Sequence, residues 1–553
     1  DAGWPLPGYP APMRTVIPLL SLVALAACHK KEDPSQPADL VFINGVIHVD
    51  IDTTATALAA NGGVIVALDA DAESMTKGAG EVVDLDGAHA FAGFQDAHTH
   101  LIPGSFVLDR LLIRGATSMD RIIEQVEDYA AETPDEPWLV AYGWLANDML
   151  PNNPRGIDLD AVTGGRPALL VDASGHNALV NSRALELAGI DVNTPDPAGG
   201  IIARDEISGE PTGLLQENAL SLVSEVAMAD YDNDVIGAGV PGTLDDFSAA
   251  GLTGIADVMA SPGFNVARPE IYADLEAAGE LPLRIHYYVP IFTLDDVAVA
   301  DSLRGTYDGE LVRFAGGKLW VDGSASSGEA WISEPAADDP SYYGSHYFDV
   351  AQLAEIISEA EALSVPLKLH CQGDAAIKAA LDAFEQVAGP GGILDQQHTL
   401  EHLSLVDPVD LARIADLGLV ASIQPIHAVL AAAGSLPEVW GEERFEASND
   451  FRAIVDAGIP IAMGTDWPVW PTGDPIVNIW GGPRAPHPIT ASEGVWGYSE
   501  GTARSVGRDD LGRLDVGYQV DLGVYNADLT TIDPADITNF TPTQMWVAGR
   551  QVR

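Results

Sequence analysis

Residues 91–100 read Phe-Ala-Gly-Phe-Gln-Asp-Ala-His-Thr-His, an apolar run that ends in two histidines. Successive side chains of a β-strand point to opposite faces, so His98 and His100 share one face, with their imidazoles close enough to bind one ion. The spacing predicts a metal site at the end of a strand. The alternative is a pair of ordinary polar histidines at a strand end, and the pair alone does not distinguish the two.

Further ligand-type residues end three later apolar runs. His370 closes Val-Pro-Leu-Lys-Leu-His, His402 follows Gln-His-Thr-Leu-Glu, and Asp466 closes Ile-Pro-Ile-Ala-Met-Gly-Thr-Asp. In a parallel α/β barrel the strand ends converge on one face, so residues far apart in sequence surround a single pocket. Lys318, in Phe-Ala-Gly-Gly-Lys-Leu-Trp-Val-Asp-Gly, occupies a similar position. A lysine ammonium cannot bind a cation, but a lysine carboxylated by carbon dioxide is an anionic ligand that can bridge two.

Apolar strand segments alternate with helical stretches from about residue 92 to about residue 510, which predicts an α/β barrel. The clearest helical patterns span 119–131, 351–363 and 375–387. Strand segments number more than eight, and they include 138–142 and 168–171. We expect the surplus to belong to an insertion of about residues 145–220, which is rich in Pro, Gly and Asn. Such long irregular stretches are usually functional or mobile.

Both ends of the chain carry β patterns. Residues 38–50 predict a hairpin, because the Asn44-Gly45 pair suits a tight type I′ turn between two strands. Asp86-Gly87 predicts another turn. Near the C-terminus, 520–525 and 545–552 have the composition of strands, the second broken by Gly549-Arg550.

Several ordered motifs extend over the chain from about residue 38 to its C-terminus. They are Gly-Phe-Gln-Asp-Ala-His-Thr-His-Leu (93–101), Gly-His-Asn-Ala-Leu-Val-Asn-Ser (175–182), Gly-Gly-Ile-Ile-Ala-Arg-Asp (199–205), Lys-Leu-Trp-Val-Asp-Gly-Ser (318–324), His-Cys-Gln-Gly-Asp-Ala-Ala (370–376), Glu-His (401–402) and Gly-Thr-Asp-Trp-Pro-Val (464–469). With them the chain resembles the metal-dependent amidohydrolase superfamily, and within it amidohydrolase family 3, which includes N-substituted formamide deformylase-like proteins. The chain departs from the motifs of the family at Gln95, Cys371, Gln372 and Thr465. None of these departures removes a candidate metal ligand.

The resemblance implies an α/β fold: a distorted (β/α)8 TIM barrel, a small β-sandwich domain built from both termini, and an insertion subdomain. The expected barrel spans residues 92–510, with the insertion at about 145–220. The expected sandwich combines residues 38–91 with 511–553, and residues 1–37 hold a signal segment and linker.

The resemblance also implies the roles of the candidate ligands. His98 and His100 with Asp466 would hold one ion, His370 and His402 the other, and carboxylated Lys318 would bridge the two. Imidazole and carboxylate ligands suit Zn²⁺. Metal-activated hydroxide would be the nucleophile, with Asp466 as general base. An uncarboxylated Lys318 beside a single ion remains the alternative.

Other residues near the predicted strand ends are candidates for a supporting role. His176, Trp320 and Trp467 are candidate substrate-binding residues, although aromatic residues there are often core and His176 could only fix a turn. His398, Asp374 and Glu401 could orient the ligand histidines or serve ordinary packing and surface roles.

The resemblance favours a hydrolase that cleaves a non-peptide C–N bond in a small amide-type substrate. The same fold could instead act on esters or cyclic amides, or deaminate rings. A catalytically inactive binding lipoprotein is a third alternative, against which the complete ligand set argues. The sequence does not indicate the oligomeric state.

The net charge of the chain limits the kinds of partner that it can bind. Its 553 residues carry a formal net charge of −55 with 47% hydrophobic residues. Such a surface repels phosphates, which excludes nucleic-acid binding, and it disfavours anionic membranes. We expect membrane association only through a lipid anchor.

The N-terminal segment predicts export. Met13-Arg14, expected to be the start, leads into an apolar run at 16–27 that is too short to span a bilayer but fits a secretory signal. Leu25-Ala26-Ala27-Cys28 resembles a bacterial lipobox, so we expect a lipoprotein of the cell envelope anchored at Cys28. A plain signal peptide or a buried apolar helix is the alternative.

Overall fold

The computed structural model describes residues 37–114, 116–145, 149, 154–197, 199–261, 264–265, 267–431, 436–532 and 540–553. The expected signal segment, the lipobox and Cys28 lie outside these residues. Among the helices within them, none combines the length and the apolar character that crossing a bilayer requires.

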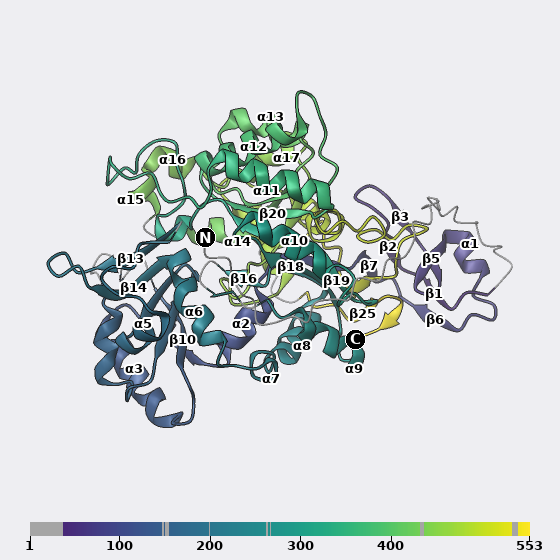
Figure 1. Cartoon of the computed structure of the whole chain (residues 1–553). Helices are drawn as coiled ribbons and strands as arrows, with labels where there is room; N and C mark the ends of the chain where they lie inside the picture. Colours follow the sequence, from purple (N-terminus) through teal and green to yellow (C-terminus); the bar gives the residue numbers. More distant parts are fainter. Residues whose placement is uncertain are drawn as a thin grey trace, which may run out of the picture.

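A mixed α/β fold is built around a parallel barrel (Figure 1). Within the described residues, eight neighbouring strands form its sheet, in the order β23-β22-β21-β20-β19-β18-β15-β8. In chain order these are β8 (Phe94–Thr99), β15 (Leu252–Asp257), β18 (Arg284–Pro290), β19 (Val312–Trp320), β20 (Leu367–Cys371), β21 (Thr399–His402), β22 (Val420–Ile423) and β23 (Ile461–Met463). Residues of β8, β15 and β20 are buried throughout, as expected for parallel strands covered on both faces. The predicted barrel is confirmed.

The two ends of this sheet meet just beyond β8 and β23. The backbone N–H of Asp466 donates to the His98 carbonyl at 2.9 Å, and the N–H of His100 donates to the Trp467 carbonyl at 2.8 Å. These bonds nearly close the barrel, and they place the first and last predicted ligand segments side by side.

Helices follow the barrel strands and cover the outside of the barrel (Figure 1). They include α8 (Val240–Ala250), α9 (Pro269–Ala278), α10 (Leu294–Leu303), α11 (Val350–Leu363), α12 (Asp374–Ala388), α13 (Pro408–Asp416) and α17 (Phe451–Asp456). The predicted helices at 351–363 and 375–387 correspond to α11 and α12, and the one at 119–131 to α3 (Met119–Glu132). Asp349 caps α11 in a reciprocal capping box with Gln352, which fixes where that helix begins.

A separate sheet lies on one side of the barrel, at the lower left of Figure 1. Its strand order is β13-β14-β12-β11-β10-β9. The strands are β9 (Leu111–Leu112), β10 (Leu139–Trp144), β11 (Ala168–Asp172), β12 (Asn177–Val180), β13 (Gly200–Arg204) and β14 (Pro211–Glu217). The surplus strands predicted at 138–142 and 168–171 therefore belong to this sheet, whose strands extend from Leu111 to Glu217.

Two further sheets lie on the other side, at the right of Figure 1. One has the order β5-β4-β1-β6 and the other β26-β25-β24-β7-β2-β3, so the second combines strands from both ends of the described chain. The strands are β1 (Leu40–Ile43), β2 (Val46–His48), β3 (Thr54–Ala55), β4 (Leu58–Asn61), β5 (Val64–Leu68), β6 (Glu81–Asp84), β7 (His89–Ala92), β24 (Leu522–Tyr525), β25 (Gln544–Val547) and β26 (Arg550–Gln551). An apolar cluster that includes Phe42, Ile47 and Trp546 packs between them.

The predicted hairpin at 38–50 is wrong. β1 pairs with β4 and β6, whereas β2 pairs with β3 and β7, so the two strands lie in different sheets. Asn44 has a φ of 57°, but Gly45 is not among the residues with positive φ, and a type I′ turn needs both. The Asn44-Gly45 turn therefore passes the chain from one sheet to the other.

Candidate metal centre

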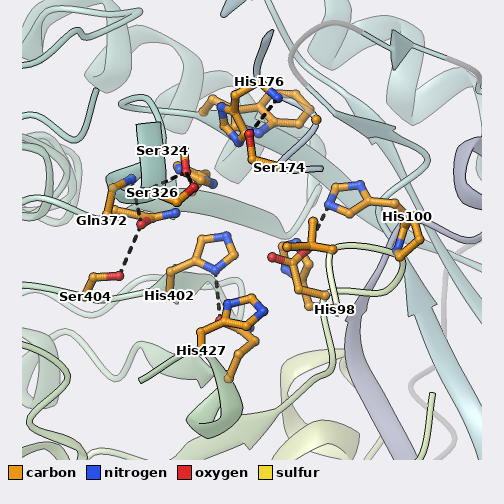
Figure 2. Close-up of a pocket in the computed structure, with 18 of the residues that line it drawn as sticks. His98, His100, Ser174, His176, Ser324, Ser326, Gln372, His402, Ser404 and His427 are labelled. Atoms are coloured by element: carbon orange, nitrogen blue, oxygen red, sulfur yellow. Dashed lines mark hydrogen bonds and ion pairs between the residues drawn. The ribbon is translucent and has the colours of Figure 1, made fainter. Parts of the chain in front are cut away.

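The predicted ligands lie at the carboxyl ends of the barrel strands. His98 is on β8, and His100 is the residue before helix α2 (Leu101–Leu108). Lys318 is on β19, while His370 and His402 are on β20 and β21. Parallel strands direct all these side chains toward the same end of the barrel. All six candidates, including Asp466, line one cavity of about 270 Å³. Figure 2 labels His98, His100 and His402 in this cavity.

His98, His100 and Asp466 form a compact trio. The Oδ1 atom of Asp466 lies 3.1 Å from His100 Nε2 and 3.5 Å from His98 Nε2. One ligand-type atom from each residue lies within 4.8 Å of the others, and all three residues are buried. His98 Nε2 and Asp466 Oδ1, which lie 3.5 Å apart, have no hydrogen-bond partner. Buried polar atoms are nearly always partnered, so atoms left without partners around one point fit a bound cation.

The electrostatics of the trio suit metal ligation. Burial lowers the pKa of His98 to about 4 despite the raising effect of Glu401, so its imidazole is neutral at neutral pH. Burial alone would raise the pKa of Asp466, but its close contact with His100 and the charges of the nearby histidines bring it well below its ordinary value. Neutral imidazoles and an ionised carboxylate are the forms that bind metal.

His370 and His402 form the second part of the centre. Their ring centroids are 4.5 Å apart, and the His402 ring lies 4.9 Å from that of His98. His402 Nδ1 is 2.8 Å from Gln424 Oε1, a contact that orients the ring and leaves Nε2 for another partner. Burial lowers the pKa of both histidines well below the ordinary value, so both are neutral.

Lys318 is a buried amine without a hydrogen-bond partner at Nζ. Burial lowers its pKa to about 8, against the raising effects of Glu401 and Asp466. A lowered pKa increases the fraction of the amine that is neutral at neutral pH, and the neutral amine is the form that reacts with carbon dioxide. The environment of Lys318 thus suits carboxylation.

His176 and Trp320 also line the cavity. His176 Nδ1 lies 2.6 Å from Glu217 Oε2, and its ring centroid is 5.6 Å from that of His370. Burial lowers the pKa of His176, but Glu217 outweighs burial and raises it overall. Trp320 stacks on Phe292 with ring centroids 5.6 Å apart, which fixes its position in the wall.

Trp467 is placed differently. It is buried, meets the Phe247 ring edge-on at 5.4 Å, and is not among the described residues that line the cavity. The next two residues, Pro468 and Val469, line it instead. The chain turns at Asp466, whose φ is 57°, and the simple alternation of strand side chains no longer applies there.

The possible supporting residues have separate roles. Glu401 contacts His98, with Oε2 2.7 Å from Nδ1. Asp374 instead accepts hydrogen bonds from the N–H and hydroxyl of Ser333, and His398 contacts Glu361 and the Leu367 N–H. Neither of these two lines the cavity.

Sequence reasoning missed several polar residues around the site. Gln424 directly follows β22, so the strand-end rule that found the histidines could have found it. Asp322 lies within the Lys-Leu-Trp-Val-Asp-Gly motif and accepts hydrogen bonds from the backbone N–H groups of Trp331, Gln372 and Gly373. Glu217 ends β14 in the separate sheet, and no local signal linked it to His176.

Comparison with known proteins places the chain in one protein family. The model of a family described as "Amidohydrolase family" matches residues 81–553. The chain is 30% identical over 469 residues to a protein of Bacillus subtilis named putative amidohydrolase YtcJ, covering 82% of this chain and 87% of that protein. It is 28% identical over 495 residues to N-substituted formamide deformylase of Arthrobacter pascens, covering 84% and 88%.

Solved structures share the fold. An uncharacterized metal-dependent hydrolase from Pyrococcus horikoshii superposes with a TM-score of 0.71 at 22% sequence identity, over 90% of this chain and 100% of that one.

Proposed function

Because this chain belongs to the amidohydrolase family, we propose that it is a metal-dependent hydrolase of a non-peptide C–N bond in a small amide-type substrate. The observation that carries the proposal is the trio of His98, His100 and Asp466, whose buried atoms lack partners and face a cavity shared with His370, His402 and Lys318. The name of the formamide deformylase relative supports an N-acyl or N-formyl substrate.

We propose Zn²⁺ as the metal, bound as about two ions, because imidazoles and carboxylates are its usual ligands in hydrolases. His98, His100 and Asp466 would hold one ion, and His370 and His402 the other. The bridging ligand would be Lys318 after its Nζ adds to the carbon of carbon dioxide and loses a proton. Bound metal would supply a stronger nucleophile at neutral pH by acidifying water, and it would polarise the substrate carbonyl.

Asp466 would act as the general base. Its carboxylate is ionised in the folded protein and lies at the junction of His98 and His100. It would accept a proton from the attacking water and later donate that proton to the leaving amine, so that the amine departs as a neutral product.

His176 would bind the substrate carbonyl oxygen. Glu217 Oε2 lies 2.6 Å from His176 Nδ1 and also accepts a 2.8 Å hydrogen bond from the Tyr347 hydroxyl. Glu217 therefore fixes the ring and favours its protonated form, which leaves the Nε2 proton to be donated to the oxygen as negative charge develops there.

The cavity wall suits a substrate whose flanking groups are apolar. Beside the metal-ligand candidates and hydroxyl groups such as Ser324, its lining includes apolar side chains: Val107, Val171, Trp320, Leu436, Phe451 and Val469. Among the described residues that line it, the charged side chains apart from the histidines are Lys318 and Asp466, both within the proposed metal centre. An uncharged acyl group or N-substituent fits such a wall, because burying an unpaired charge there would be costly.

The experiment is a hydrolysis screen with purified protein. N-substituted formamides, longer N-acyl amines, esters, cyclic amides and aminopurines are incubated with it, and amine, acid and ammonia are measured. We expect free amine and carboxylate in equal amounts from the acyclic amides, loss of the activity after removal of metal, and recovery with Zn²⁺. Cleavage of esters or release of ammonia, with all acyclic amides left intact, would contradict the proposed bond specificity.

We also propose that the protein is an exported lipoprotein of a bacterial cell envelope, on the basis of the lipobox-like Leu25-Ala26-Ala27-Cys28. Expression of the full chain in a bacterium, followed by fractionation and mass analysis of the N-terminus, tests this. We expect a membrane-associated form that begins at lipidated Cys28, and its loss in Cys28→Ser. Protein that stays entirely cytosolic with an intact N-terminus would contradict the localisation.

A further inference from the structure

A second cluster of ligand-type side chains lies in the sheet that combines both ends of the chain. His48 ends β2, His89 begins β7, and Asp528 follows β24 by three residues. β2 runs parallel to β7, with Val46 opposite His89, and β24 runs antiparallel to β7, with Tyr525 opposite His89. Three adjacent strands therefore bring these side chains close together.

The cluster is compact and partly enclosed. His48 Nε2 lies 3.0 Å from His89 Nδ1, and one ligand-type atom from each of the three residues lies within 4.8 Å of the others. His48 is buried, while His89 and Asp528 are half-buried. The three residues are not among the described residues that line the catalytic cavity.

Neighbouring side chains hold the cluster in place. The His48 ring stacks on Phe91, with centroids 4.0 Å apart and an angle of 12° between the planes. The Oδ1 atom of Asp528 accepts hydrogen bonds from the Thr530 N–H at 3.0 Å and the Thr530 hydroxyl at 2.6 Å. These bonds fix the carboxylate and leave its second oxygen for another partner.

The separations fit one small cation. Zinc lies about 2.0–2.2 Å from histidine nitrogen and carboxylate oxygen, so two ligand atoms of a tetrahedral zinc site lie roughly 3.3–3.6 Å apart. The two histidine nitrogens, at 3.0 Å, are close to that separation. The carboxylate oxygen lies within 4.8 Å of both, and the half-buried Asp528 side chain, which stands in a turn, can move closer to a bound ion.

We propose that His48, His89 and Asp528 form a binding site for one divalent transition-metal ion, separate from the catalytic centre. The donor set, two imidazoles and one carboxylate, is the kind that zinc prefers, with water in the remaining position. The ion crosslinks strands from opposite ends of the chain. Because β7 leads through Gly93 directly into β8, it also anchors the start of the strand that carries His98.

The test compares the metal content of full-length wild type with that of two variants, His89→Gln and Asp528→Asn. Each protein is loaded with Zn²⁺, freed of excess metal by gel filtration and analysed for zinc per chain. His487→Gln is the matched control, because His487 is a half-buried histidine that contacts the Glu446 carbonyl and belongs to neither cluster. We expect wild type and His487→Gln to carry about one more zinc per chain than His89→Gln or Asp528→Asn.

Thermal unfolding provides a second readout. Adding Zn²⁺ to the protein freed of metal should raise the Tm of wild type by more than that of Asp528→Asn, because an ion that binds only the folded chain stabilises it. Equal zinc content and equal Tm shifts in all four proteins would overturn the proposal and leave the histidines as a hydrogen-bonded pair. If His89→Gln fails to fold, the same comparison is made with Asp528→Asn alone, because that change alters only a half-buried side chain in a turn.

Discussion

The Nδ1 atom of His98 lies 2.7 Å from Oε2 of Glu401, a residue 303 positions later in the chain. The other carboxylate oxygen of Glu401 accepts a 2.8 Å hydrogen bond from Lys368 Nζ, and all three residues are buried. Glu401 thereby fixes the orientation of His98 and leaves Nε2 directed at the proposed metal centre, an arrangement that is usual around a metal-bound histidine. Lys368 balances the charge that this arrangement buries.

Glu401→Gln should weaken metal binding about 10–100-fold, because losing a carboxylate that orients a ligand histidine typically has that effect. The variant should also lose about 3–5 kcal/mol in its free energy of unfolding, since Lys368 becomes an unpaired buried charge. Zinc titration and denaturant unfolding measure the two effects. Adding Lys368→Met should restore stability without restoring zinc affinity. Wild-type zinc affinity in Glu401→Gln would show that the contact does not orient a ligand.

Asp466→Asn keeps the shape of the side chain and one oxygen ligand but removes the basic carboxylate. Metal should be largely retained, while kcat falls by at least about 10²-fold, as expected when a general base is lost. Zinc analysis and steady-state kinetics on the same preparation separate the two roles. Loss of both metals would make the role of Asp466 chiefly structural. Retention of metal with near-full activity would place the base elsewhere.

Lys318→Ala should lose metal and activity together, because the proposed bridge disappears. Short-chain carboxylic acids such as acetate or propionate should restore part of the activity, since they can supply the missing oxygens. Lys318→Arg is the control: it keeps a positive charge but cannot be carboxylated in the same way, and it should be as inactive as the alanine variant. A Lys318→Ala protein with full metal content and rate would exclude Lys318 as a ligand.

Glu225 lies in α6 (Ser221–Met228). We expect it to make the stability of the folded protein depend on pH, independently of the metal centre. Burial raises its pKa from 4.5 to about 7. The folded state thus prefers the protonated acid, so this residue costs stability progressively as pH rises from about 4.5 to about 7. Glu225→Gln should therefore raise the Tm by about 1–2 °C near pH 8 and by less near pH 5. The exposed Glu355→Gln is the control, and an equal effect at both pH values would contradict the assignment.

Much of the centre could be predicted from sequence, because the barrel strands are near-continuous apolar segments and their carboxyl ends meet at one face. His98, His370 and His402 all end or directly follow such segments, and they line one cavity. Gln424 occupies an equivalent position after β22 but was missed, because an amide is not an obvious metal ligand. Its role depends on the contact with His402, which only the fold reveals.

Other features depend on long-range pairing that local patterns do not encode. The Asn44-Gly45 dipeptide predicts a turn, but whether the flanking strands pair with each other depends on competing partners, here β6 for β1 and β7 for β2. Trp467 illustrates a different limit: its neighbour Asp466 has positive φ, so the side of the chain on which the indole packs could not follow from strand alternation. The Glu217–His176 pair joins the last residue of β14 to the residue before β12, and these two strands are not consecutive along the chain.

Anomalous diffraction at the zinc absorption edge, from crystals of protein purified without chelator, tests the metal centre most directly. We expect about two peaks in the cavity, one beside His98, His100 and Asp466 and the other beside His370 and His402. Crystals grown with zinc that show no peak at either position would contradict the proposed metal-dependent hydrolase.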